Sequence, residues 1–143
     1  MTRYVLDTNI ISDVTRPQPA EALVKWMAGQ ADENLFIASL TVGEIRRGLL
    51  QIPAGAKRRA LERWFAGPEG LQALFAGRVL PFDEAAALVW ARLMAEGTAM
   101  GRPRSALDMI VAAIAEANDC VVATGNEMDF AGIAIVNPLR AAV

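Results

Sequence analysis

The chain has 143 residues, a formal net charge of −2, a hydrophobic content of 54% and a mean hydropathy of +0.29. This composition favours a single folded domain over residues 1–143 and argues against a disordered chain or a polybasic nucleic-acid binder. The sequence has no histidine and one cysteine, Cys120, which excludes histidine-based catalysis and an internal disulfide and leaves oxygen ligands, such as those of Mg²⁺ or Mn²⁺, for any metal.

In the first half of the chain, short apolar runs alternate with segments of helical periodicity. The apolar runs predict strands over residues 4–6 and 35–38. Helices are expected over 10–14, 20–28, from Ser39 or Thr41 to about residue 50, and over 57–65, with a break at Pro53 and Gly55.

The second half continues the alternation. It predicts an edge strand over 78–81, a helix capped by Asp83 over 84–96, a loop over 97–103, a helix over 105–118, and strands over 121–123 and 133–136. The strands are short and almost wholly apolar, as buried parallel strands are. The expected fold class is α/β, a three-layer sandwich with a short central parallel sheet flanked by helices.

Four acidic residues, Asp7, Glu44, Asp108 and Asp129, are expected at one edge of this sheet. Asp7 and Asp129 follow strands, and sites in such sheets form at the carboxyl ends of the strands. Glu44 and Asp108 lie in the early turns of helices near the same edge. Two like charges about 4 Å apart repel by roughly 4 kcal/mol at an effective dielectric near 20. A convergent cluster therefore favours a divalent cation or a retained proton.

Each acid also has a purely structural explanation. Asp7 can cap a helix, Asp108 can complement a helix dipole, Glu44 can be solvated, and Asp129 can belong to a turn. The expected occurrence of all four at one edge is what favours a functional site.

Polar residues near the acids are candidates for supporting the carboxylates or contacting a substrate. Hydroxyl groups can hydrogen-bond a carboxylate or a phosphate, although local turn bonding is their more common role. The candidates are Thr8, Asn9, Thr124, Asn126, Arg102 and Arg104, with Arg46 and Arg47 as weaker phosphate-binding candidates.

Four segments resemble the PIN-domain family, and within it the VapC/FitB-type toxins of bacterial toxin–antitoxin pairs. They are residues 6–12, 43–48, 108–113 and 124–130, and Asn137-Pro138 also fits. The resemblance covers essentially the whole chain, in order. It implies a Mg²⁺- or Mn²⁺-dependent ribonuclease that is usually dimeric and is neutralised by a small antitoxin.

Carried over by position, the resemblance makes Asp7, Glu44 and Asp108 the core acids and metal ligands, and Asp129 the fourth catalytic acid with Asn126 beside it. One departure concerns this last loop, where Gly125 stands in place of an arginine that the group often has. The role of the loop is therefore less firmly implied than that of the other acids.

The function expected from these features is that of a metal-dependent endoribonuclease, the toxin of a type II toxin–antitoxin system. A metal ion held by carboxylates would lower the pKa of a bound water for attack on an RNA phosphodiester. Expected partners are RNA, a small DNA-binding antitoxin and a second copy of the chain. The dimer is expected because Trp64, Phe65 and the helix bearing Trp90 offer more aromatic surface than a small core needs.

Two alternatives remain open. In one, the chain is a non-enzymatic binding module whose acidic pocket docks an arginine of a partner. In the other, it is a haloacid dehalogenase-like phosphatase with Asp7 as nucleophile, although that chemistry wants an acid where Asn9 stands. No apolar run is long enough for a membrane span and no signal peptide is evident, so we expect a cytoplasmic protein without a membrane partner.

Overall fold

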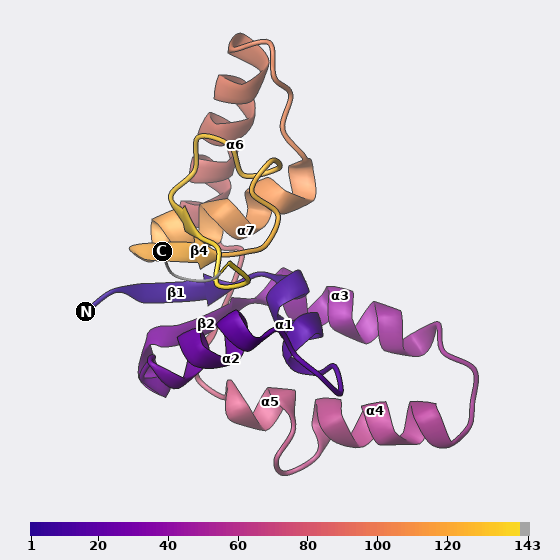
Figure 1. Ribbon diagram of the computed structural model, residues 1–143. Coiled ribbons are helices and arrows are strands. Elements are labelled where there is room, and N and C mark those ends of the chain that lie inside the picture. Colours follow the sequence, from indigo (N-terminus) through magenta and orange to yellow (C-terminus); the bar gives the residue numbers. More distant parts are fainter. Residues whose placement is uncertain (141–143) are drawn as a thin grey trace.

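A parallel sheet lies at the centre of the molecule (Figure 1). The structure is a computed structural model that describes residues 1–140. In this part of the chain the sheet has five strands in the order β3-β2-β1-β4-β5. All neighbouring pairs are parallel. The strands are β1 (Arg3–Leu6), β2 (Leu35–Ala38), β3 (Val79–Leu80), β4 (Cys120–Ala123) and β5 (Ile135–Val136).

Helices connect the strands and cover the sheet. They are α1 (Thr8–Val14), α2 (Glu21–Ala28), α3 (Ser39–Leu50), α4 (Ala56–Ala66), α5 (Leu71–Leu74), α6 (Glu84–Ala99) and α7 (Ala106–Ala117), with a short 3₁₀ helix at Asp32–Asn34. Each helix predicted from the sequence is present, whereas α5 and the 3₁₀ helix were not predicted. Within residues 1–140, no helix has both the length and the apolar character needed to cross a membrane.

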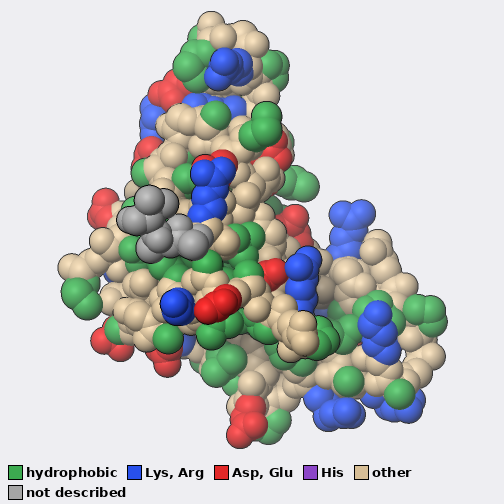
Figure 2. All heavy atoms as spheres, viewed as in Figure 1, with side chains coloured by type: hydrophobic (Ala, Val, Ile, Leu, Met, Phe, Trp, Pro, Cys, Tyr) green, Lys and Arg blue, Asp and Glu red, His purple; other side chains and the backbone are tan. Residues whose placement is uncertain are grey.

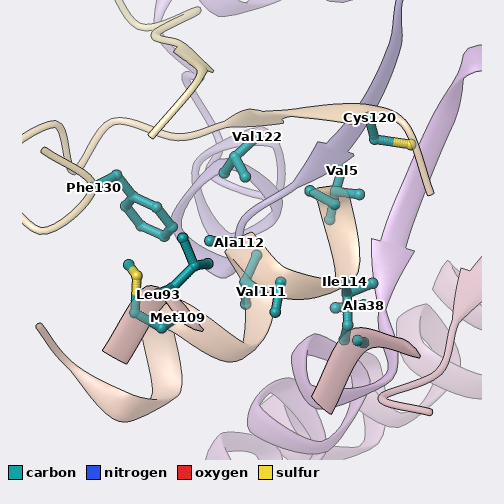
Figure 3. Packing of buried hydrophobic residues seen from close by; sticks show 13 residues of the cluster. Val5, Ala38, Leu93, Met109, Val111, Ala112, Ile114, Cys120, Val122 and Phe130 are labelled. Atoms are coloured by element: carbon teal, nitrogen blue, oxygen red, sulfur yellow. The ribbon is translucent and has the colours of Figure 1, made fainter. Parts of the chain in front are cut away.

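Successive strand residues point to opposite faces of the sheet and so supply two separate cores. Val5 and Val122 belong to the cluster beneath α6 and α7, in which Figure 3 shows Met109 and Phe130 on either side of Leu93. Leu6 and Ala123, the next residues along β1 and β4, belong to the opposite cluster.

The second core is built by the helices from the first half of the chain. Its buried residues include Ile10 of α1, Leu23 of α2, Leu49 of α3, Phe65 of α4 and Leu71 of α5. Helices therefore cover both faces of a parallel sheet, which confirms the predicted three-layer α/β sandwich. The prediction of one domain over residues 1–143 stays a prediction, and residues 141–143 lie outside the described part of the chain.

The order of the strands reverses between β1 and β4. The chain builds β1, β2 and β3 outward in one direction and then returns to place β4 and β5 on the other side of β1. In open parallel sheets, ligands bind beyond the carboxyl ends of the strands at such a switch point. At this position the backbone N–H of Asp7 donates to the carbonyl of Ala123 at 2.9 Å, which joins the two strand ends.

One predicted boundary was wrong because Gly97 is not a helix breaker here. The helix expected over 84–96 continues as α6 to Ala99, and Gly97 lies buried inside it. The helix ends at Ala99 with Met100 as its C-cap, and Gly101 follows with a φ of +70°, which glycine readily adopts. The N–H of Arg102 donates to the carbonyl of Gly97 at 2.9 Å, as in a Schellman C-cap.

Two further predictions differ from the structure. The last strand was predicted over 133–136, but β5 covers only Ile135–Val136, after a left-handed turn at Gly132 with a φ of +83°. Neither Ser39 nor Thr41 caps α3, which starts after Ala38 without a side-chain cap. Thr41 is buried, and its hydroxyl has no hydrogen-bond partner among the described residues.

Candidate active site

Asp7 is fixed at the carboxyl end of β1, where it also caps α1. Its extended backbone, with φ −71° and ψ 160°, suits an N-cap residue. One carboxylate oxygen, Oδ1, accepts from the N–H of Thr8 at 2.9 Å, and the other, Oδ2, accepts from Thr124 Oγ1 at 2.9 Å. The residue is only 6% exposed, so these two bonds hold a buried carboxylate in one orientation.

A network of polar groups from α1 and from the segment after β4 supports this carboxylate. Thr124 Oγ1, which donates to Asp7, accepts from Asn9 Nδ2 at 3.3 Å and from the N–H of Asn126 at 3.0 Å. The N–H of Gly125 donates to Asn9 Oδ1 at 3.2 Å. Asn9 and Thr124 thus connect the two strand ends at the switch point, and both were predicted as supporting residues.

Glu44 reaches the same edge from α3. Thr8 Oγ1 donates to Glu44 Oε1 at 2.8 Å, so the residue after Asp7 orients the acid from the next strand–helix unit. Asp108 approaches from the first turn of α7, and its N–H is capped by Ser105 Oγ at 3.3 Å.

Pairwise charge interactions link the four acids, with Asp108 as the one that connects to Asp129. Burial is the largest cause that raises the pKa of Asp7, hydrogen bonds from Thr124 and Thr8 lower it, and the charges of Asp108 and Glu44 raise it further. Burial also raises the pKa of Asp108 most, a hydrogen bond from Ser105 lowers it, and the charges of Asp129 and Glu44 raise it. The structure therefore brings the four predicted acids into one electrostatic neighbourhood.

Asp129 has a more open position than the other acids. It is exposed, and its Oδ2 accepts from Asn126 Nδ2 at 2.6 Å. Gly125, the residue before Asn126, lies against Leu139, and an added Cβ would come within 2.5 Å of Leu139 Cδ1. A larger residue at position 125 would thus require the Leu139 side chain to move.

The two arginines before Asp108 have different surroundings. Arg104 is mostly buried, donates from Nη1 to the carbonyl of Leu93 at 2.7 Å, and lies 3.6 Å from Glu96. These contacts hold its guanidinium in place, and its predicted contact with a substrate stays a prediction. Arg102 is exposed, and it lines a groove of about 580 Å³ together with Arg104, Asp129 and the exposed Met128. Of the two, Arg102 is the better placed for a substrate rim.

Ser105 is the residue near the acids that sequence reasoning did not single out. A serine three residues before an acid at a helix start is the pattern of a capping box, which could have identified it. Its hydroxyl both caps α7 and hydrogen-bonds Asp108, so it holds that acid at the start of the helix.

The donor set fits a hard divalent cation that keeps part of its water shell. Within residues 1–140, no group of three or more Asp, Glu, His or Cys side chains has the geometry to hold a metal ion by itself. Mg²⁺ does not require such a group, because it usually keeps several waters and takes one or two carboxylates. Asp7 and Asp108 supply two interacting carboxylates, with Glu44 close to both.

Comparisons with known proteins identify the family of this chain. The PIN domain family model matches residues 4–136. The chain is 41% identical over 136 residues to VapC ribonuclease Y4jK of Sinorhizobium fredii, covering 94% of this chain and 96% of that protein. It is 35% identical over 136 residues to Toxin FitB of Neisseria gonorrhoeae, with the same coverage of both chains.

Solved structures give the same result. FitAB bound to an IR36 DNA fragment matches with a TM-score of 0.89 at 35% identity, over 98% of each chain. FitAcB from Neisseria gonorrhoeae matches with a TM-score of 0.85 at 36% identity, over 94% of this chain and 97% of that chain. From the family match, these relatives and the shared fold, we conclude that this chain belongs to the PIN domain family.

Proposed function

We propose that this protein is a metal-dependent endoribonuclease and the toxin of a type II toxin–antitoxin pair. The observation that carries the proposal is that Thr8 hydrogen-bonds both Asp7 and Glu44 at the sheet's switch point. There the charge of Asp108 also raises the pKa of Asp7, and the charge of Asp129 raises the pKa of Asp108. Support comes from similarity to proteins named as a VapC ribonuclease and a FitB toxin. The FitAB and VapBC assemblies among the structural neighbours support a small DNA-binding antitoxin as partner.

The residues of the site would have distinct roles in binding the metal and in orienting its ligands. Asp7 and Asp108 would hold Mg²⁺ or Mn²⁺, Glu44 would complete the site, and Asp129 would act at its open side. When bound, the ion would supply activation of a water molecule and neutralisation of charge on the phosphate. Thr8, Thr124 and Asn9 would keep the carboxylates of Asp7 and Glu44 oriented, through the hydrogen bonds that they already make.

The phosphatase alternative has little support. Both carboxylate oxygens of Asp7 accept hydrogen bonds, and Asn9 uses its side chain to join Thr124 and Gly125. A lysine near the phosphate would also be needed. Lys25 lines a separate groove between α2 and the segment after β5, and Lys57, in the first turn of α4, makes no hydrogen bond to Asp7 in the described part of the chain. The binding-module alternative differs from the nuclease in predicting no RNA cleavage, so the cleavage assay below distinguishes the two.

The test is cleavage of a structured RNA pool by single variants in Mg²⁺. Asp7→Asn, Glu44→Gln and Asp108→Asn should each reduce cleavage to the level of a reaction without enzyme. Each substitution removes a negatively charged oxygen ligand from the proposed metal site and so weakens metal binding. Asp129→Asn should cleave more than these three, because Asn126 and water can partly replace an exposed carboxylate.

Matched controls are Glu33→Gln, in the 3₁₀ helix, and Asp119→Asn, which precedes β4 at the opposite edge of the sheet. Both acids are exposed, and both variants should cleave like the wild type. Normal cleavage by folded Asp7→Asn and Asp108→Asn would refute the proposed function and leave the acids as partners for an arginine of another protein.

A further inference from the structure

The small net charge of the chain hides a strongly uneven distribution. Residues 46–63 hold six of the 14 lysines and arginines but only one of the 16 acidic residues. We name this segment the α3–α4 arm, because it runs from the middle of α3 into α4. Its charged residues are Arg46, Arg47, Lys57, Arg58, Arg59, Glu62 and Arg63. Outside the arm, acidic residues outnumber basic ones.

Two of the six cations are used inside the arm. Arg46 Nη1 lies 2.7 Å from Glu62 Oε2, which connects α3 to α4, and its guanidinium stacks over the ring of Phe65 at 5.5 Å. Arg58 Nε lies 3.8 Å from the other oxygen of Glu62. The single acid of the arm is therefore shared by two arginines.

The other four cations, Arg47, Lys57, Arg59 and Arg63, are exposed. None of them forms an ion pair in the described part of the chain. They come from both helices of the arm, which the Arg46–Glu62 pair holds together. The arm thus presents positive charge that the fold itself does not neutralise.

This arrangement opposes the stability of α4. The first turn of the helix carries Lys57, Arg58 and Arg59 and no acid, although the positive end of a helix dipole favours anions there. Arg59 and Arg63 are four residues apart on one exposed face, a spacing at which like charges destabilise a helix. Departures from local stability rules of this kind are expected at functional surfaces.

The arm is continuous with the candidate active site. Glu44 lies two residues before Arg46 on α3, and α3 and α4 extend from the side of the sheet where α1 and α3 begin (Figure 1). Figure 2 shows Lys and Arg side chains gathered over the lobe in which Figure 1 places α3 and α4. A polyanion that reaches the four acids from this side would lie along the arm.

We propose that Arg47, Lys57, Arg59 and Arg63 bind the phosphodiester backbone of RNA beside the bond that is cleaved. The inference rests on the proposed function and adds to it the surface that holds the substrate. A cluster of carboxylates repels RNA, so attraction must come from elsewhere on the protein. Arginine is well suited to it, because its planar fork matches phosphate geometry. Each phosphate that is neutralised also releases bound counterions.

The experiment measures binding of a labelled single-stranded RNA in EDTA, so that cleavage plays no part. The arm variant combines Arg47→Ala, Lys57→Ala, Arg59→Ala and Arg63→Ala. The control variant combines Arg16→Ala, Lys25→Ala, Arg92→Ala and Arg140→Ala, which removes the same charge from exposed residues outside the arm. Melting curves of both proteins establish that they fold.

Between about 50 and 200 mM KCl, the arm variant should bind more than about tenfold more weakly than the wild type, with a salt slope smaller by about 3, since each single-strand contact contributes about 0.7. The control variant should stay close to the wild type. A variant with Arg47→Lys, Arg59→Lys and Arg63→Lys should keep the wild-type slope, because it keeps the charge.

Two results would overturn the proposal. In the first, the arm and control variants lose the same affinity and slope. In the second, the arm variant binds RNA normally but no longer binds the antitoxin, which would assign the arm to an acidic protein segment.

A cleavage assay in Mg²⁺ separates this proposal from the proposed nuclease function. On a short oligonucleotide that spans only the acidic edge, the arm variant should cleave like the wild type, whereas Asp108→Asn should be inactive. If the wild type binds RNA through the arm but cleaves no RNA, the arm proposal stands and the nuclease proposal fails.

Discussion

At the scale of single residues, Asp7 and Asp108 should respond differently to loss of their charge. Thr124 Oγ1 already accepts from Asn9 and Asn126, so its own hydrogen is committed to Asp7. An asparagine at position 7 has one acceptor for the two donors, Thr8 N–H and Thr124 Oγ1. A buried donor left unpaired costs about 1–3 kcal/mol, which offsets the relief of repulsion. Asp7→Asn should therefore leave the stability of the metal-free protein almost unchanged.

Asp108→Asn should instead stabilise the metal-free protein at neutral pH. The pKa of Asp108 is raised in the folded chain, by burial first and then by the charges of Asp129 and Glu44, against a hydrogen bond from Ser105. The folded protein therefore holds this proton to a higher pH than the unfolded chain, and the wild type loses stability as the pH rises through that window. Asparagine has no proton to lose.

The measurement is the melting temperature of the wild type and of Asp108→Asn in EDTA, across pH values from acid to neutral. The advantage of Asp108→Asn should be absent below about pH 4, where an ordinary aspartate is protonated, should grow as the pH rises, and should then level off. Asp119→Asn, at the opposite edge of the sheet, provides the matched control. An advantage of Asp108→Asn that does not change with pH would show that repulsion at the site is not its cause.

At the scale of elements, local patterns predicted the helices and strands, and they failed where packing decides. Asp7 and Asp83 cap α1 and α6 as expected, because a cap depends only on nearby residues. The extension of α6 through Gly97 could not be read locally, because it depends on the loop that packs against the helix. Likewise, the acids were placed at one edge from the ends of strands and the starts of helices, whereas the burial of Arg104 depends on contacts with α6.

Gly97 should not tolerate alanine, although it lies inside a helix. An added Cβ would meet Arg104 Cγ at 2.9 Å and the carbonyl oxygen of Arg102 at 3.0 Å. Overpacking of this kind costs about 1–3 kcal/mol, which exceeds the helix propensity of about 1 kcal/mol that alanine gains over glycine. Gly97→Ala should therefore lower the free energy of unfolding in urea.

Gly48 is the matched control, because it lies in α3 with nothing within 4 Å of an added Cβ. Gly48→Ala should stabilise the protein by about 0.5–1 kcal/mol. If the two substitutions change the free energy of unfolding equally, the close approach of the loop to Gly97 does not affect the stability of the protein.

At the scale of the whole molecule, opposite charges are segregated along one side of the sheet. The interacting acids lie at the strand ends, and the four unpaired cations of the α3–α4 arm extend from the same edge. This separation explains how a chain with a net charge of only −2 could attract RNA and a divalent cation to adjacent surfaces. Composition averages over the two regions and so could not have indicated the arm.

The homodimer was expected from aromatic residues on two helices, α4 with Trp64 and Phe65, and α6 with Trp90. Phe65 is only 6% exposed and belongs to the core, so the aromatic residues of α4 do not supply the expected excess. The start of α6 is different. Leu88 is 69% exposed, and Phe82, just before the helix, is 40% exposed and lies edge-on to Trp90 with ring centroids 6.5 Å apart. This is an exposed aromatic and aliphatic surface of the kind enriched at interfaces.

We therefore predict a homodimer that the start of α6 holds together, with a light-scattering mass of twice 15.3 kDa at micromolar concentration. Leu88→Arg should give a monomer with an unchanged fold, because a charge in a buried apolar contact is strongly unfavourable. Leu74→Arg, at a leucine of α5 that is 59% exposed, should remain dimeric and controls for the added charge. A monomeric wild type would exclude the dimer itself, whereas a dimeric Leu88→Arg would place the interface elsewhere on the molecule.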